Sequence, residues 1–160
     1  MKRLTIGVAG VCVGLITAAV QLSSAPPGKT APSAATLARG KYLVENIGLC
    51  ADCHTPHDQK GEPIAGRALH GAPLFFKPLG PVPGWVDKAP NIAGLPGWTD
   101  EQAIKFFTTG VAYNDLPAGP PMPQFRYNRQ DAAAVVAYLR SLTPAKGATL
   151  IKSVPAPQRK

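Results

Sequence analysis

The sequence predicts an all-α fold of three to four short helices joined by long loops. Helix-capping patterns precede apolar residues at helical spacing near residues 33, 99 and 128. The 18 Pro and 16 Gly among 160 residues interrupt regular structure between these helices. This length suits one domain plus a targeting segment.

The stretch Cys50-Ala51-Asp52-Cys53-His54 is a complete C-x-x-C-H motif, the spacing by which c-type haem is attached. Both thiols can bond to one porphyrin, and the histidine can donate an imidazole nitrogen to the iron. A structural zinc site would need a second Cys pair, and a thioredoxin-like dithiol would accompany a βαβ pattern. Neither feature follows in the sequence, so the motif predicts one covalently attached haem c held by Cys50, Cys53 and His54.

With this motif the chain resembles the monohaem class I type cytochromes c of the bacterial periplasm. The resemblance covers residues 34–143 and includes the segment 40–44, the run Pro121-Met122-Pro123 and the helix predicted at 131–142. It implies the cytochrome c fold, with the helices packed around the haem. The match is weaker over residues 58–90, where the connection is longer and richer in proline.

Residues 1–25 resemble an export signal, with Lys2-Arg3 before an uncharged apolar run at 4–20. This predicts a periplasmic protein. Pro26 directly after the small residues disfavours cleavage there, so an uncleaved anchor in the inner membrane stays an alternative. Cys12 is interpreted as a small apolar residue of this leader and not as a lipidation site.

Residues 26–33 are predicted to be a flexible linker. Ser33 or Thr36 is expected to cap the first helix, which runs to about residue 46. In the resembled family the first and last helices cross at a glycine, here Gly40, with Tyr138 or Leu139 opposite. The residues expected on one face of the first helix are Leu37, Gly40, Val44 and Ile47.

Residues 58–98 are predicted to form an extended loop along one haem edge, because seven prolines interrupt it. The apolar residues Leu74, Phe75, Phe76 and Trp85 could pack on the porphyrin or, equally, on protein alone. The resemblance implies that a carbonyl of this loop orients the proximal histidine, and Pro73 is the predicted donor of that carbonyl. The spare histidines His57 and His70 are not expected to bind iron. Candidate propionate ligands, for which ordinary loop packing is an equal alternative, are Arg67, Trp85, Asn91, Trp98 and Tyr113.

Two further helices are predicted after this loop. Thr99 begins a capping box for a helix to about residue 108, with Ile104 and either Phe107 or Phe106 facing inward. Asn128 caps the last helix, and Thr143-Pro144 stops it. The basic segment 144–160 is expected to be an extended or disordered tail. The apolar stripe expected on the last helix is Ala132, Val135, Leu139 and Leu142.

Met122 is the only methionine besides the initiator, and prolines flank it on both sides. A thioether ligand raises the reduction potential of haem iron and completes its coordination. The alternative is a core methionine that fills a gap. Ligation by His54 and Met122 leaves no position for a substrate, so the predicted function is electron transfer and not catalysis. The alternative function is a haem enzyme or gas-binding protein with an open sixth position.

The net charge of +8 favours redox partners with acidic docking surfaces. A nucleic-acid partner is not expected, because no dense basic run or interleaved aromatic stripe is present. The protein could diffuse freely or serve as the cytochrome subunit of a dehydrogenase. Membrane contact is expected only through an uncleaved N-terminal anchor.

Overall fold

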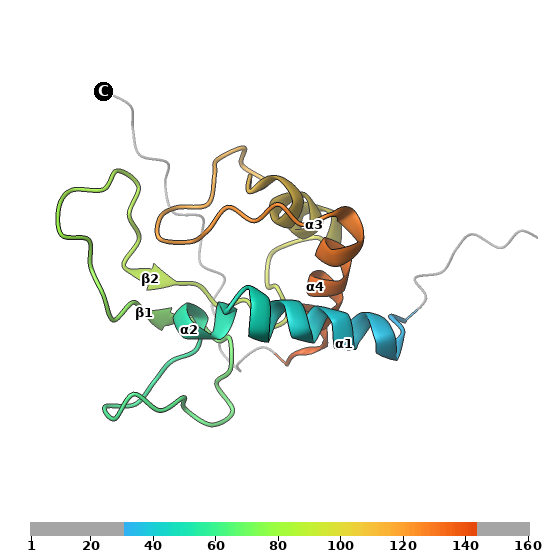
Figure 1. The fold of residues 1–160 in the computed structure, drawn as a ribbon, viewed down its shortest axis with the longest axis horizontal. Helices are drawn as coiled ribbons and strands as arrows, with labels where there is room; N and C mark the ends of the chain where they lie inside the picture. Colours follow the sequence, from blue (N-terminus) through green and yellow to red (C-terminus); the bar gives the residue numbers. More distant parts are fainter. Residues whose placement is uncertain (1–30, 144–160) are drawn as a thin grey trace, which may run out of the picture. The chain divides into compact units, whose positions relative to one another are not determined.

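The computed structural model describes residues 31–143 as short helices joined by long loops (Figure 1). The predicted leader, residues 26–30 of the linker and the basic tail lie outside this part of the chain. The all-α prediction is confirmed, with one small addition, a two-stranded sheet. The elements in order are α1 (Ala34–Tyr42), η1 (Leu43–Ile47), α2 (Cys50–His54), β1 (Ala72–Pro73), β2 (Lys88–Ala89), α3 (Asp100–Thr109) and α4 (Arg129–Ser141).

Helix α1 follows its N-cap Ser33, whose side chain accepts a hydrogen bond from the Thr36 amide at 3.1 Å. It packs across α4, as the sequence predicts. A Cβ added to Gly40 would overlap the main-chain carbonyl of Ala134 and lie 2.8 Å from the Tyr138 Cβ. Gly40 is therefore required at the crossing, because only a residue without a side chain allows this approach.

A π-helical turn, η1, continues α1 and changes which residues face the core. The Gly48 amide donates to the Leu43 carbonyl at 2.7 Å, five residues back. The wider turn places Leu43 and Val44 inside, at 3% and 1% exposure, and leaves Ile47 at 52%. The prediction that Ile47 lies on the buried face was therefore wrong, because helical periodicity assumes an uninterrupted α-helix.

Helices α3 and α4 begin at the predicted caps. Thr99 and Gln102 form the complete capping box of α3, and Gly110 ends that helix in the left-handed conformation. The Asn128 side chain accepts from the Asp131 amide at the start of α4. Leu142 lies beyond the end of α4 and is only half-buried.

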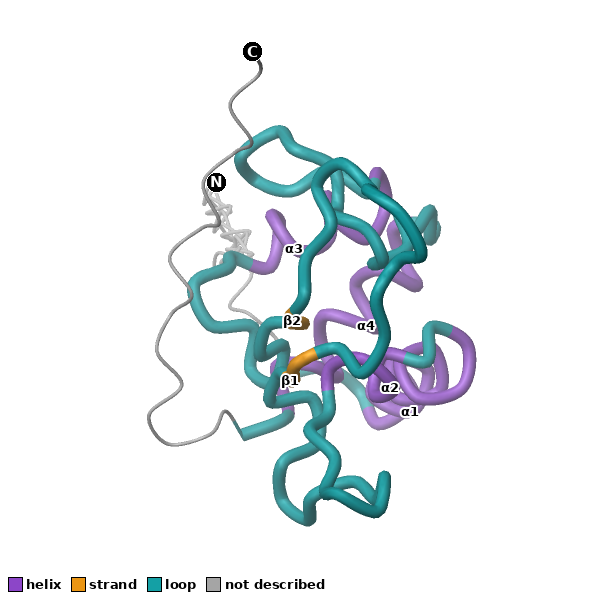
Figure 2. The backbone as a smooth tube through the Cα atoms, turned by 90° about the vertical axis from the view of Figure 1, so that its left-hand side faces the viewer, coloured by secondary structure: helices purple, strands orange, loops and turns teal. Residues whose placement is uncertain are grey.

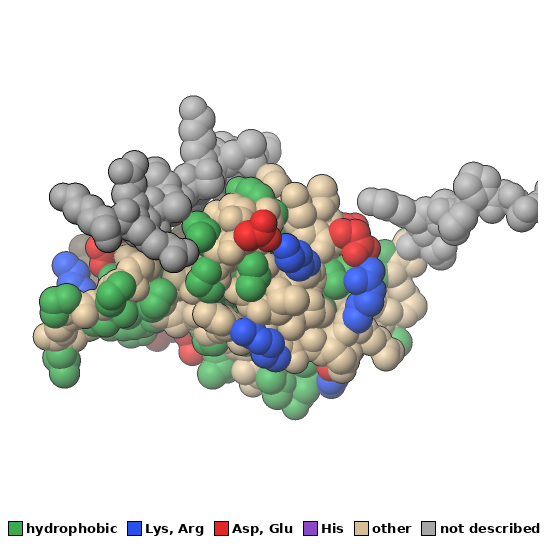
Figure 3. All heavy atoms as spheres, turned by 90° about the horizontal axis from the view of Figure 1, so that it is seen from above, with side chains coloured by type: hydrophobic (Ala, Val, Ile, Leu, Met, Phe, Trp, Pro, Cys, Tyr) green, Lys and Arg blue, Asp and Glu red, His purple; other side chains and the backbone are tan. Residues whose placement is uncertain are grey.

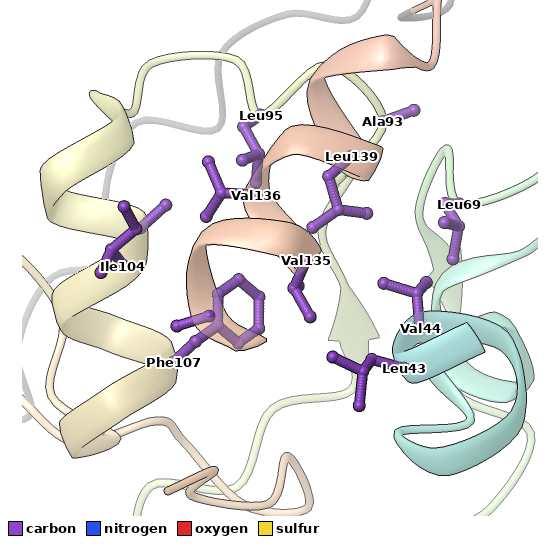
Figure 4. Close-up of a cluster of buried hydrophobic side chains, with 12 residues drawn as sticks. Leu43, Val44, Leu69, Ala93, Leu95, Ile104, Phe107, Val135, Val136 and Leu139 are labelled. Carbon is purple, nitrogen blue, oxygen red and sulfur yellow. The ribbon is translucent and has the colours of Figure 1, made fainter. Parts of the chain in front are cut away.

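One hydrophobic core joins the crossing helices to the loop between β2 and α3 (Figure 4). The predicted inward residues of α3 and the first three of the α4 stripe belong to it. Its buried members are Leu43, Val44, Leu69, Ala93, Leu95, Ala103, Ile104, Phe107, Ala132, Val135, Val136 and Leu139.

Long connections form the remainder of the described chain (Figure 2). Strands β1 and β2 pair antiparallel, Ala72 with Ala89 and Pro73 with Lys88. The sequence predicted no regular structure here, and two-residue strands are too short to show a period. The pairing closes the base of a loop, residues 74–87, and brings the residue after β2 next to α2.

Candidate functional site

The C-x-x-C-H motif forms one helical turn, α2, which ends with His54. Leu49 precedes it in the left-handed region, at φ 47°, and so turns the chain sharply between η1 and α2. Both thiols are half-buried, and His54 is only 5% exposed. The single turn therefore presents two sulfur atoms and an imidazole to the interior beside it.

The orientation of His54 is fixed by Pro90. Its Nδ1 lies 2.7 Å from the Pro90 carbonyl oxygen, a geometry in which the ring nitrogen donates and the carbonyl accepts. Burial lowers the pKa of His54 and outweighs the opposite effect of this hydrogen bond, so the ring is neutral at pH 7. With Nδ1 carrying the proton, Nε2 keeps the lone pair that a metal ligand needs.

The prediction that Pro73 supplies this carbonyl was wrong. The main-chain carbonyl of His54 accepts from the Gly71 amide at 2.7 Å, which holds β1 against α2 by the backbone. Pairing of β1 with β2 then delivers Pro90, the first residue after β2, to the imidazole. Both prolines follow an alanine within the predicted loop 58–98, so the sequence carried no signal to distinguish them.

Two adjoining cavities open beside α2, and four residues line both: Cys50, His54, Pro90 and Met122. The larger cavity has a volume of about 820 Å³ and the smaller cavity about 480 Å³, and both volumes include space that is open to solvent. The larger is walled mainly by apolar and aromatic side chains of α3 and of the loop before it. These are Ile92, Leu95, Pro96, Trp98, Ala103, Phe106 and Phe107.

The loop after α3 places Met122 at these cavities together with His54. The Met122 amide donates to the Gly119 carbonyl at 3.0 Å, which tightens the turn before the thioether. The Val86 amide donates to the Pro120 carbonyl at 2.9 Å and ties this loop to the 74–87 loop. Pro121 and Pro123 flank Met122 in the lining of the smaller cavity.

Of the candidate propionate ligands, Asn91 and Trp98 line the larger cavity. The Oδ1 of Asn91 accepts from the Ala93 amide at 2.9 Å, whereas its Nδ2 is buried without a partner. An unpartnered buried amide donor is costly unless it meets an acceptor, so this nitrogen suits a carboxylate in the cavity. Trp98 is held edge-on by Tyr113, at 5.0 Å between ring centroids, but Tyr113 does not line either cavity.

The remaining candidates lie away from the cavity walls. The Trp85 indole donates to Asp87 at 3.1 Å, and Arg67 lines neither cavity. His57 is exposed, and the Nε2 of His70 lies 3.1 Å from the Thr143 carbonyl. Neither spare histidine lines either of the two cavities.

The residues that line the two cavities fit a haem. They combine apolar walls with two thiols on one turn, a neutral imidazole, a thioether and the unpartnered amide of Asn91. Within residues 31–143 no group of three or more His, Cys, Asp or Glu side chains could hold a metal ion alone. Burial raises the pKa of the Cys50 thiol to about 11, the opposite of the lowered pKa typical of a reactive dithiol.

This combination of fold and site defines a c-type haem protein. The family model "Cytochrome c" matches residues 37–143, and the chain belongs to that family. It is accordingly an electron-transfer haem protein, with haem c attached covalently at a motif that Cys50, Cys53 and His54 fit.

Its curated relatives include cytochrome subunits of bacterial dehydrogenases. The fructose dehydrogenase cytochrome subunit of Gluconobacter japonicus is 32% identical over 118 residues, which is 68% of this chain and 22% of the relative. The gluconate 2-dehydrogenase cytochrome c subunit of Pantoea cypripedii is 28% identical over 116 residues, 66% of this chain and 26% of the relative. A diheme cytochrome c-type protein of Cereibacter sphaeroides is 31% identical over 108 residues, 64% of this chain and 34% of the relative. The chain therefore spans about a fifth to a third of the length of these relatives.

None of the helices between residues 31 and 143 is long and apolar enough to cross a bilayer.

Proposed function

We propose that this protein transfers single electrons through one haem c, whose iron His54 and Met122 would ligate. The observation that carries the proposal is that both side chains line the same two cavities, although they come from distant parts of the sequence. Bound haem supplies one-electron redox chemistry, and a thioether ligand raises its potential. Two protein ligands leave no position for a substrate.

The surrounding residues support this role. The Pro90 carbonyl fixes the His54 ring, and so holds Nε2 in one direction. The apolar side chains that line the larger cavity exclude water, which favours the less charged, reduced state of the iron. The smaller cavity, between Leu74, Val86 and the prolines beside Met122, gives an apolar edge through which a partner could approach.

The protein would act in the periplasm, either as a diffusible carrier or as the cytochrome component of a dehydrogenase. The export-type leader supports the location, and the names of the relatives support the dehydrogenase role. The net charge of +8 favours partners with acidic surfaces near their redox centres.

The test is replacement of Met122. The wild-type oxidised protein should show the weak near-infrared band of Met–iron ligation, and its reduced form should bind carbon monoxide poorly. Met122→Ala should lose the band, bind carbon monoxide rapidly and have a lower reduction potential. Met122→His should again exclude carbon monoxide while keeping a low potential.

Ile64→Ala, which truncates an exposed apolar side chain outside both cavities, is the control and should behave as the wild type. Rapid carbon monoxide binding by the wild type, together with an unchanged potential in Met122→Ala, would contradict the proposal. That result would favour a haem enzyme or gas-binding protein with an open iron position.

A further inference from the structure

The loop between β1 and β2, residues 74–87, projects from the helical body (Figure 1). Its base is held by the strand pair and by the Leu74 amide, which donates to the Asp87 carbonyl at 2.8 Å. Beyond this base the loop exposes large apolar side chains instead of burying them. The exposed fractions are 111% for Leu79, 80% for Phe75, 39% for Val82 and 37% for Phe76.

The haem site does not account for these side chains. Leu74 and Val86, at the base of the loop, line the smaller cavity, whereas Phe75, Phe76, Leu79 and Val82 line neither cavity. The sequence left open whether Leu74, Phe75, Phe76 and Trp85 pack on the porphyrin or on protein. Of these four side chains, only Leu74 lines a cavity of the haem site. The aromatic rings contact one another edge-on, Phe75 with Phe76 at 5.3 Å and Phe76 with Trp85 at 5.8 Å between centroids.

The charge and the backbone of the loop suit a lipid surface. No acidic residue occurs between Glu62 and Asp87, while Lys77 lies among the exposed apolar side chains. Near a negatively charged leaflet a lysine is attracted to the headgroups, and aromatic rings favour the boundary between headgroups and acyl chains. Pro78, Pro81 and Pro83 have no amide hydrogen, which reduces the number of backbone donors that must leave water.

We propose that the 74–87 loop inserts its apolar tip into the interfacial layer of an anionic bilayer. Hydrophobic side chains gather at the projecting end of the molecule (Figure 3). A projecting loop can enter a fluid headgroup layer without a matching concave surface, which a protein partner would have to supply. This membrane contact is separate from any contact that the predicted N-terminal leader would make.

This contact would also place the smaller cavity relative to the lipid. Leu74 and Val86, at the base of the loop, line that cavity, so insertion of the tip would bring the cavity toward the lipid surface. The inference goes beyond electron transfer and holds whether or not Met122 binds the iron.

The experiment measures binding of the exported, haem-loaded protein to sedimented vesicles, with the same N-terminus in every variant. Vesicles of phosphatidylcholine with phosphatidylglycerol are compared with phosphatidylcholine alone. The double variant Phe75→Ser/Leu79→Ser should bind the anionic vesicles about tenfold more weakly than the wild type. The matched control Ile47→Ser/Ile64→Ser removes two exposed apolar side chains elsewhere and should bind as the wild type does. An unchanged visible spectrum shows that each variant keeps its haem and its fold.

A second readout reports insertion directly. A Cβ at Gly80 meets nothing within 4 Å, so Gly80→Cys accepts an environment-sensitive fluorophore, in a Cys12→Ser background, without disturbing the loop. Its emission should shift to the blue on anionic vesicles, whereas a label on exposed Gln130→Cys, at the start of α4, should not shift.

Equal vesicle binding by the loop variant and the control variant, or no blue shift at residue 80 on bound protein, would overturn the proposal. A shift at residue 80 that requires an added redox protein, and not lipid, would likewise overturn it and assign the loop to protein docking.

Discussion

Gly40 of α1 faces the main-chain carbonyl of Ala134 in α4 with no room for a side chain between them. The Tyr138 Cβ, one turn further along α4, would lie only 2.8 Å from a Cβ at Gly40, so two successive turns of α4 close on this position. This crossing supports the core residues Val44, Val135 and Leu139.

Gly40→Ala should therefore destabilise the protein, by about 2–4 kcal/mol, because the added methyl group overlaps backbone that cannot rotate away. Guanidinium unfolding followed by circular dichroism measures this change. Gly80→Ala is the matched control, since a Cβ there meets nothing within 4 Å, and its effect should stay within about 0.5 kcal/mol. Equal effects of the two substitutions would show that α1 and α4 can separate without cost.

Haem attachment should depend on both cysteines of α2. The wild-type protein should carry the mass of one haem, bound through thioethers at Cys50 and Cys53, whereas Cys53→Ala should accumulate poorly and lose most of its haem. Mass spectrometry of the periplasmic fraction checks both results. Apoprotein with two free thiols in the wild type would refute covalent attachment at this turn.

Arg140 holds the loop that lines the larger cavity. Its guanidinium donates to the carbonyls of Gly94, at 2.7 Å, and Leu95, at 2.9 Å, and also to that of Trp98. Arg140→Ala removes these three hydrogen bonds and should cost about 2–4 kcal/mol, measured by guanidinium unfolding. It should also change the haem absorption spectrum, because Leu95 and Trp98 line the cavity.

Arg129 provides the control for Arg140. It pairs with Glu101 at 2.9 Å, but both side chains are more than 70% exposed. Arg129→Ala should change the unfolding free energy by less than about 0.5 kcal/mol and leave the spectrum unchanged. If both arginine variants lost the same stability, the carbonyl contacts of Arg140 would not be its main contribution.

The ion pair at the start of α4 should make the free energy of unfolding depend on pH in the acidic range. Arg39 donates to both carboxylate oxygens of Asp131, at 2.8 and 3.0 Å, and holds the pKa of that carboxyl below its unfolded value of 3.8. The contribution is present above the unfolded pKa and is lost as the pH falls through the lower folded pKa. The stability difference between the wild type and Asp131→Asn should therefore be constant above about pH 5 and shrink below pH 4.

Unfolding curves at a series of pH values measure this difference. In an Arg39→Gln background the same substitution should lose most of its acid dependence, because the guanidinium is the largest cause of the shift. A difference between wild type and Asp131→Asn that grows on acidification would contradict the sign of the linkage.

The sequence by itself determined the helix starts and the haem turn. Caps depend on residues three positions apart, so Thr99 and Asn128 could be identified from local chemistry, and Ser33 as one of two candidates beside Thr36. The C-x-x-C-H spacing is equally local, and family membership confirms covalent haem. Gly40 also carried a signal, because it interrupts an otherwise good helix.

Only the tertiary structure decided which distant groups meet. Pro90, and not Pro73, reaches His54, because the pairing of β1 with β2 sets which side of the loop faces the imidazole. The π-helical turn brings Leu43 into the core and turns Ile47 out, against helical periodicity. The exposure of Phe75 and Leu79 could not be predicted from the sequence either. An apolar residue favours apolar surroundings, but the sequence does not show whether its own fold provides them.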